Sequence, residues 1–167
     1  MGTAGSAARC CAQAVAAMAG AGLRVLGVVK EYGFNHVRFH TWCPPEAAFE
    51  VADRVGLYLQ PETPAWVDDW GLKTETRPSG IGHDRDVVEY LRAELTRICA
   101  AYGNHPSFVM LTIGNEFGFN GTDWACVDRM VEEIRTADPR RLYCGCTARK
   151  HLPNDDYWIT HQCGAAT

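Results

Sequence analysis

The stretch Leu111–Phe119, LTIGNEFGF, places an Asn-Glu pair directly after an apolar run, with a glycine on either side. Such a run is typical of a buried strand, so we expect Glu116 to stand at a strand end, where partial burial raises a carboxyl pKa. A carboxylic acid that keeps its proton near neutral pH suits general acid catalysis. Asn115 offers both a donor and an acceptor, which suits binding of a substrate hydroxyl.

Further polar and aromatic residues fall at the ends of predicted strands or in the connections after them. Arg38 and His40 are suited to bind hydroxyls or a carboxylate, and tryptophan rings offer flat apolar faces to a sugar ring. The pattern therefore predicts a carbohydrate substrate, with Glu116 as the catalytic group. The predicted substrate-binding residues are Asn115, Arg38, His40, Glu62, Trp42, Trp66, Trp158 and His161.

Each of these residues also has a purely structural explanation. A single Glu after a strand more often caps a helix or lies in a solvated loop, and Arg38 is equally suited to a buried ion pair with Glu62. Any one tryptophan more often packs in a core or a loop. The His, Asp and Glu residues lack a recognised ligand spacing, and no cysteines form a C-x-x-C pair, so we predict neither a metal site nor a cofactor.

Length and composition fit a single globular domain of 167 residues, 47% hydrophobic and 22% charged. The net charge of -4 and the lack of a basic run argue against a nucleic-acid partner. No apolar stretch reaches the roughly 18–20 residues that a membrane span needs, so no membrane partner is expected. The Ala- and Gly-rich start is unconvincing as a signal peptide, which leaves only a weak preference for a cytoplasmic location.

Helix and strand patterns alternate from Gly22 onward. A helix ends near residue 32, and others are expected over 44–55, 88–102 and 123–137; strands are expected over 35–40, 57–60, 108–113, 142–146 and 157–160. This order predicts a parallel α/β sheet, doubly wound or barrel. No nucleotide-binding glycine motif follows a strand, and the long connection 61–85 is of a length that is usually functional.

Two longer stretches, EYGFNHVRFHTWCPPEAAFEVADRVGLYLQPE and YGNHPSFVMLTIGNEFG, resemble the catalytic barrel of glycoside hydrolase family 2, the β-galactosidase and β-glucuronidase family. The resemblance runs from about residue 30 to residue 160. It implies an α/β fold, a (β/α)8 TIM barrel that hydrolyses β-glycosides with retention, here incomplete with about strands two to six. It also implies that Glu116 is the acid/base and that Asn115 binds the hydroxyl next to the reacting carbon.

The same resemblance places Arg38 on the family's strand-two arginine and Glu62 on the acidic position after strand three. His40 departs from the pattern, because the family's histidine lies one residue further from the arginine. Retention needs two carboxylates about 5–5.5 Å apart, and the family's nucleophile is a Glu at the end of strand seven. No Glu follows Glu133, and a barrel of this type takes about 250 residues.

We therefore expect residues 23–167 to be part of a retaining β-glycosidase barrel with little or no hydrolase activity alone, preceded by an Ala/Gly-rich segment over 1–22. Two open sheet edges would favour self-association. A cellulase- or mannanase-type barrel is one alternative, although many of those place Pro after the Asn-Glu pair. A carbohydrate-binding or scaffolding domain without catalysis is the other.

Overall fold

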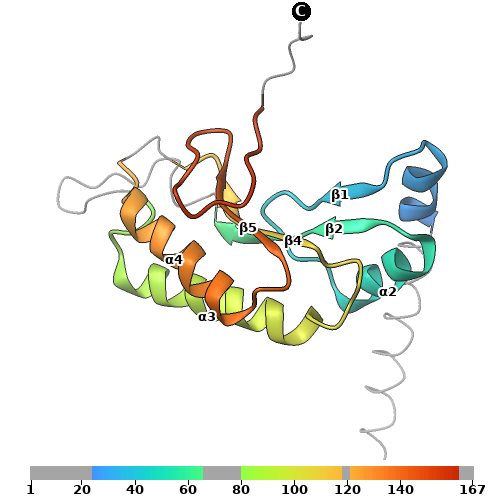
Figure 1. The fold of residues 1–167 in the computed structure, drawn as a ribbon, viewed down its shortest axis with the longest axis horizontal. Helices are drawn as coiled ribbons and strands as arrows, with labels where there is room; N and C mark the ends of the chain where they lie inside the picture. The colour runs from blue at the N-terminus through green and yellow to red at the C-terminus, as the bar shows by residue number, and fades with distance from the viewer. Residues whose placement is uncertain (1–23, 66–79, 118–120, 162–167) are drawn as a thin grey trace, which may run out of the picture.

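The computed structural model describes residues 24–65, 80–117 and 121–161, in which strands and helices alternate along the chain (Figure 1). Residues 24–31 are helical and precede the first strand. The predicted α/β order is confirmed. The strands are β1 (His36–Arg38), β2 (Tyr58–Gln60), β3 (Glu62–Ala65), β4 (Met110–Asn115) and β5 (Leu142–Thr147), and the helices are α2 (Glu46–Val55), α3 (Arg85–Tyr102) and α4 (Trp124–Ala137).

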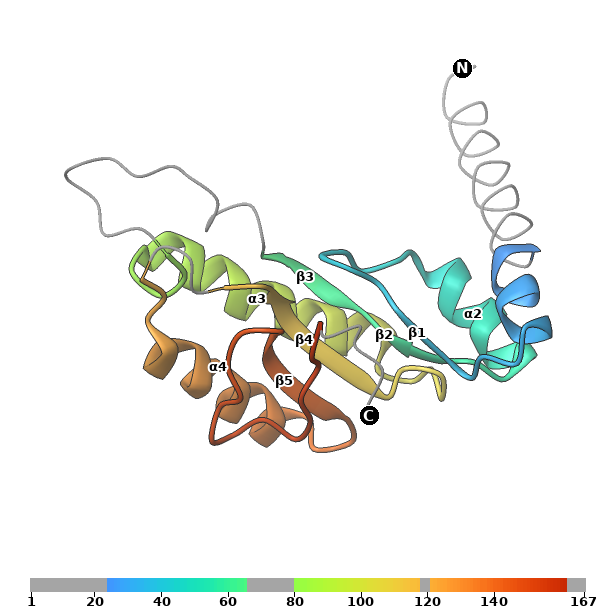
Figure 2. The ribbon, with the colours of Figure 1, turned by 90° about the horizontal axis from the view of Figure 1, so that it is seen from above.

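All three strand pairs in the described part of the chain are parallel. β2 and β3 follow one another directly and are separated only by Pro61. β1 pairs with β2, whereas β3, β4 and β5 pair in that order. Proline has no N–H to donate to a ladder, but the Pro61 carbonyl still accepts the Thr112 amide at 3.2 Å. A parallel bridge between Leu59 and Phe108 joins β2 to the residues just before β4. The strands therefore lie side by side as an open parallel sheet, consistent with an incomplete TIM barrel (Figure 2).

The helices begin and end where capping chemistry predicts. α2 follows Pro45, and Gly56 ends it in the left-handed conformation with φ 74°. Asp84 caps α3 by accepting two backbone amides, and Asp123 caps α4 in the same way. These caps fix the starts of the two long helices that cover the sheet.

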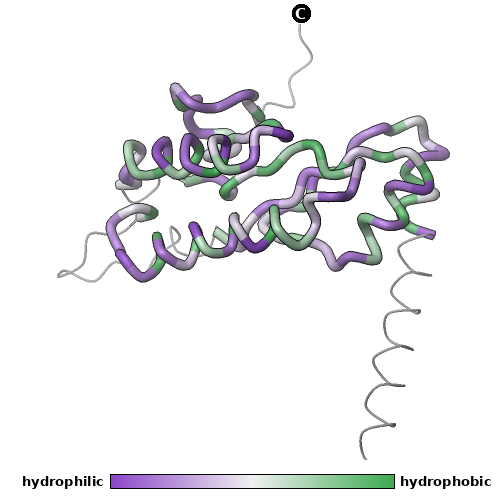
Figure 3. The backbone as a smooth tube through the Cα atoms, turned by 60° about the horizontal axis from the view of Figure 1, so that its bottom comes forward, coloured by the Kyte–Doolittle hydropathy of each residue, from purple (hydrophilic) through white to green (hydrophobic). Residues whose placement is uncertain are grey.

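The core lies between the sheet and the helices on its outer side. α3 and α4 each turn one apolar face inward, so both helices alternate between hydrophilic and hydrophobic colours in Figure 3. α4 packs so closely on β5 that a Cβ added to Gly145 would lie 2.9 Å from Val127 Cγ1. No helix in the described part of the chain has the length and apolar character to cross a membrane. The most deeply buried side chains include Phe49, Leu59, Leu91, Leu95, Ile98, Leu111, Ile113, Met130 and Tyr143.

The prediction of a structureless connection from residue 61 is wrong at its start, because Glu62–Ala65 forms β3. The polar residues and Pro64 hide this strand in the sequence. Pro64 is tolerated because the pairing with β4 is irregular, with register partners only at Glu62 and Ala65. The strand matters for the site because it carries Glu62 into the sheet.

The predicted strand over 157–160 is also wrong, since these residues have no strand structure. The edge of β5 that faces them is occupied by side chains. Asp155 Oδ1 accepts the Gly145 amide at 2.7 Å, and Asp156 Oδ2 accepts the Tyr143 amide at 2.9 Å. Carboxylates thus take two positions of a strand ladder. Self-association through open sheet edges stays a prediction, as does the division at residue 22.

Candidate active site

The carboxyl ends of three strands meet around the guanidinium of Arg38, the last residue of β1. Its Nε donates to Glu62 Oε1 at 2.6 Å, and its Nη2 donates to Asn115 Oδ1 at 2.8 Å and to Thr147 Oγ1 at 3.3 Å. The ion pair with Glu62, the structural alternative for Arg38, is therefore present. One side chain joins β1, β3, β4 and β5.

Thr147, the last residue of β5, completes this network and was missed by the sequence reasoning. Its hydroxyl donates to Asn115 Oδ1 at 2.6 Å, and its carbonyl accepts the Glu116 amide at 3.3 Å. Both Thr147 and Asn115 are buried. A polar residue closing an apolar strand is the signal that identified Asn115, and the same signal points to Thr147.

Glu116 lies just past β4 with a partly open side chain. His161 Nδ1 contacts Glu116 Oε1 at 2.7 Å, and the two side chains are 33% and 25% exposed. Two of the predicted site residues, Glu116 and His161, are therefore brought together. A quarter of this carboxyl side chain is exposed, so it is accessible to a bound molecule, and the His161 ring contacts one of its oxygens.

Three non-glycine residues in the described part of the chain have positive φ, and all follow strands of the sheet. They are Thr41 (φ 51°) after β1, Glu116 (φ 52°) after β4 and Ala148 (φ 71°) after β5. For a branched residue such as Thr41 this conformation is an outlier. The Thr41 amide donates to Glu62 Oε2 at 2.7 Å, which holds it in place. Strained backbone of this kind gathers at functional sites, and here it marks the carboxyl edge.

None of the hydrogen bonds given above to the network comes from the remaining predicted residues in the described part of the chain, His40, Trp42 and Trp158. His40 is exposed, and its Nδ1 contacts the Thr41 hydroxyl at 3.0 Å. Trp42 is 54% exposed and packs edge-on against Phe39, and Trp158 is 55% exposed beside His151. Trp66 lies outside the described residues. About half of Trp42 and of Trp158 is thus exposed to solvent.

A short chain of buried polar groups runs across the sheet below the network. Gln60 Nε2 donates to Thr112 Oγ1 at 2.7 Å, and the Tyr157 hydroxyl lies 2.9 Å from the same atom. Burial raises the pKa of Tyr157 well above its usual value, so its hydroxyl stays protonated. Tyr157 therefore anchors the segment after β5 to Thr112 of β4, four residues before His161.

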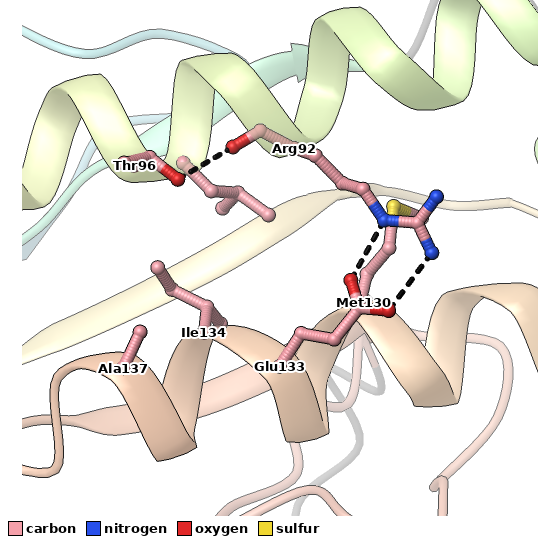
Figure 4. Close-up of a pocket in the computed structure, with 7 residues that line it drawn as sticks. Arg92, Thr96, Met130, Glu133, Ile134 and Ala137 are labelled. Carbon is pink, nitrogen blue, oxygen red and sulfur yellow. Dashed lines mark hydrogen bonds and ion pairs between the residues drawn. The ribbon is translucent and has the colours of Figure 1, made fainter.

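A hollow of about 270 Å³ lies elsewhere, between α3 and α4 (Figure 4). Leu95, Met130 and Ile134 line it, and the ion pair between Arg92 and Glu133 spans it. These groups belong to the helix layer rather than to the strand ends. The hollow brings no carboxylate and base together, so the carboxyl edge is the better candidate site.

The two carboxylates of the carboxyl edge differ in what they can do. Glu62 has no exposed surface, and both of its oxygens accept hydrogen bonds, from Arg38 and from the Thr41 amide. Both Glu62 oxygens are therefore occupied by hydrogen bonds within the protein. Glu116 is the carboxylate that faces outward, with Asn115 beside it.

Comparison with known proteins gives a single picture. Residues 23–157 match the family model described as Glycosyl hydrolases family 2, TIM barrel domain. A β-galactosidase of Leuconostoc mesenteroides is 29% identical over 114 residues, which are 68% of this chain and 10% of that protein. The chain therefore spans about a tenth of the length of the curated relatives it matches.

Solved structures share the fold. A β-glucuronidase of Parabacteroides merdae has a TM-score of 0.66 at 17% identity, covering 84% of this chain and 17% of its own. A β-glucuronidase of an uncultured Clostridium species has a TM-score of 0.64 at 22% identity, covering 84% of this chain and 24% of its own. Identities this low support the barrel architecture alone.

Proposed function

The chain belongs to glycosyl hydrolases family 2, within its TIM barrel domain, and from this premise we propose that it forms part of the catalytic barrel of a retaining β-glycosidase. The observation that carries the proposal is the Asn115-Glu116 pair at the carboxyl edge of the sheet. Active sites of TIM barrels are built at that edge. The relatives named as β-galactosidases and β-glucuronidases make a β-galactoside or a β-glucuronide the substrates to test first.

In this proposal Glu116 acts first as an acid and then as a base. Its carboxyl proton passes to the glycosidic oxygen as the bond to the reacting carbon breaks, and the resulting carboxylate later takes a proton from the attacking water. The contact with His161 supports this role, because it orients one carboxyl oxygen, Oε1. Asn115 binds the hydroxyl beside the reacting carbon.

The second carboxylate is proposed to lie outside these 167 residues. Glu62 is committed to Arg38 and Thr41, and no Glu follows Glu133 in the sequence. Retention requires a nucleophile about 5–5.5 Å from the acid. We therefore expect the 167-residue chain to have little or no hydrolase activity by itself.

Parallel assays of two proteins test the proposal: the 167-residue chain and the longest open reading frame that contains it. Each is given phenyl and dinitrophenyl β-galactosides and β-glucuronides. In the longer protein, Glu116→Gln should lower kcat/KM for the phenyl glycoside by about 10²- to 10⁴-fold. The loss should be smaller for the dinitrophenyl glycoside, since its leaving group needs little protonation. Glu89→Gln on the exposed face of α3 is the control and should change neither rate.

Each outcome has a distinct meaning. Turnover by the 167-residue chain that disappears in Glu116→Gln would show that the second carboxylate is within it after all. An unchanged rate in Glu116→Gln of the longer protein would remove Glu116 from the mechanism. Sugar binding without hydrolysis by the longer protein would favour the non-catalytic carbohydrate-binding alternative.

A further inference from the structure

The orientation of the Asn115 amide is fixed by chemistry. Asparagine oxygen and nitrogen have nearly the same shape, but a guanidinium has only donors. The atom that lies 2.8 Å from Arg38 Nη2 must therefore be the acceptor, Oδ1. Asn115 is 1% exposed, so this contact is not exchanged for one with water.

The hydroxyl proton of Thr147 is fixed by the same reasoning. Arg38 Nη2 donates to Thr147 Oγ1 at 3.3 Å, which makes the hydroxyl oxygen an acceptor there. A hydroxyl has one proton, and it is left to donate to Asn115 Oδ1 at 2.6 Å. Both acceptor positions of Oδ1 are then filled, one by Arg38 and one by Thr147.

Because Oδ1 already accepts two hydrogen bonds, it is not available to accept one from a ligand. No hydrogen bond within the described residues uses the Asn115 Nδ2, so this N–H group is the part of the amide that is left to donate to a ligand. Thr147 also accepts the Glu116 amide through its carbonyl at 3.3 Å. One residue of β5 thus holds both members of the Asn-Glu pair, Asn115 by its side chain and Glu116 by its backbone.

We propose that Thr147 is a positioning residue that locks Asn115 as a hydrogen-bond donor to an acceptor oxygen of the sugar. The inference rests on the proposed function, since that supplies the sugar. It adds a residue from β5 and assigns the direction of the hydrogen bond. Without the Thr147 hydroxyl, Oδ1 keeps one acceptor position open and the amide is held by Arg38 alone.

The direct test is the NMR signal of the Asn115 side chain in the labelled 167-residue chain, which needs no ligand. Thr147→Val keeps the shape and the backbone carbonyl but removes the hydroxyl, and it should shift the Asn115 Cγ resonance upfield. Thr147→Ser restores the donor and should return the signal toward the wild-type position. Thr96→Val, which removes a hydroxyl that bonds the Arg92 carbonyl on α3, is the matched control and should leave the signal unmoved.

A measurement on the unsubstituted chain covers the case in which Thr147→Val does not fold. A scalar coupling between the Thr147 hydroxyl proton and Asn115 Cγ reports the same hydrogen bond. Detecting it supports the proposal, and a Thr147 hydroxyl proton coupled to another acceptor overturns it. An Asn115 signal that is identical in folded Thr147→Val and in the wild type would overturn it too.

The functional arm uses the longer protein and two glycosides, one with and one without the hydroxyl beside the reacting carbon. Thr147→Val should reduce the preference for the hydroxylated glycoside by about 2- to 10-fold, the size of one net hydrogen bond, and Thr147→Ser should restore it. A preference unchanged in Thr147→Val overturns the role toward substrate. If the longer protein cleaves neither glycoside, the proposed function fails, whereas the NMR arm still decides whether Thr147 orients Asn115.

Discussion

Two ion pairs with buried carboxylates lie at opposite ends of the sheet. The arginine of one contacts side chains of other strands, and the arginine of the other contacts a backbone carbonyl. At the carboxyl edge, Arg38 pairs with Glu62 and reaches the side chains of Asn115 and Thr147 on two further strands. At the amino edge, Arg141 pairs with Asp138 and donates its Nη2 to the Gly103 carbonyl at 2.6 Å. Both carboxylates are almost fully buried, at 0% and 8% exposure.

The side chains of the amino-edge pair bind backbone groups in two connections of the chain. Asp138 follows α4, accepts the Arg140 amide at 3.2 Å and binds Arg141, which in turn bonds the carbonyl that follows α3. The Arg141 guanidinium also lies 4.2 Å from the centre of the Phe108 ring. All of these contacts are to residues in the connections that follow α3 and α4. The pair therefore fixes the positions of the two connections that lead from these helices back to the sheet.

The carboxyl-edge pair instead fixes side chains of neighbouring strands relative to one another, and in the described residues the Asn115 Nδ2 is not used in a hydrogen bond. The difference teaches that burial of an ion pair does not by itself indicate its role. What matters is whether its hydrogen bonds end on the backbone or on side chains that face a ligand. We therefore expect damage at the amino edge to cost stability, and damage at the carboxyl edge to disturb the site as well.

The largest stability effect is expected from Asp138→Asn. This change leaves the Arg141 charge buried without a counter-charge, in a side chain that is 2% exposed and whose Nε already has no partner. Breaking a buried pair in this way costs about 3 to 5 kcal/mol. Chemical denaturation of the two proteins measures the loss. Arg140→Gln is the matched control, because Arg140 binds the same carboxylate but is 58% exposed, and it should cost far less than Asp138→Asn.

The loss in Asp138→Asn should depend on pH with a defined sign. Hydrogen bonds from Arg140 and, to a smaller degree, the charge of Arg141 hold the pKa of Asp138 below its usual value in the folded state. The stabilisation is therefore complete above the unfolded value of about 3.9 and disappears as pH falls through the lower folded pKa. The stability curves of the two proteins should converge in acid. Curves that stay parallel down to about pH 2 would contradict the assignment of the charge pair.

The sequence predicted those parts of the fold that depend on local patterns. Apolar spacing identified α2, α3 and α4 and the buried run of β4, and the predicted spans 44–55 and 123–137 agree with the ends of α2 and α4 to within two residues. β3 was missed because its residues, ETPA, carry no strand pattern and are held by pairing with β4. The segment 157–160 was misassigned because two aspartates occupy the edge that it would have joined.

The candidate site shows the same division. Glu116, Asn115, Arg38 and Glu62 are recognisable as polar residues beside apolar strands, and the structure brings them together. The ion pair between Arg38 and Glu62 was only one of two alternatives, the other being an Arg38 that binds substrate. The sequence does not specify which acceptors Arg38 reaches. Thr147 was missed because the predicted strand stopped one residue too soon. Its hydrogen bond is to Asn115, 32 residues away in the sequence, and a local pattern does not reveal such a contact.

A smaller effect on stability, joined to an effect on the site, is expected from Arg38→Lys. Lysine keeps the charge near Glu62, but an ammonium cannot span Glu62, Asn115 and Thr147 as the planar guanidinium does. The loss of one charged hydrogen bond should cost about 2 kcal/mol. Because the Arg38 side chain is 23% exposed, water can replace part of the contact, and the loss should remain below that of Asp138→Asn.

The same variant should move the Asn115 side-chain NMR signal, whereas Asp138→Asn should not. This contrast is what separates the two pairs. A shift of the Asn115 signal in Asp138→Asn equal to that in Arg38→Lys would show that the two edges are coupled and would break the comparison.

The smallest effect is expected from Glu133→Gln, which removes the ion pair between α3 and α4 shown in Figure 4. Its geometry is as good as that of the buried pairs, with two bonds of 2.7 and 3.0 Å to Arg92. Its side chains, however, are 39% and 52% exposed, and water screens such pairs. We expect a loss of about 0.5 kcal/mol, measured by denaturation, which vanishes at about 1 M salt because screening there acts within about 3 Å. A loss that matches Asp138→Asn or persists in salt would mean that geometry, and not burial, sets the strength of these pairs.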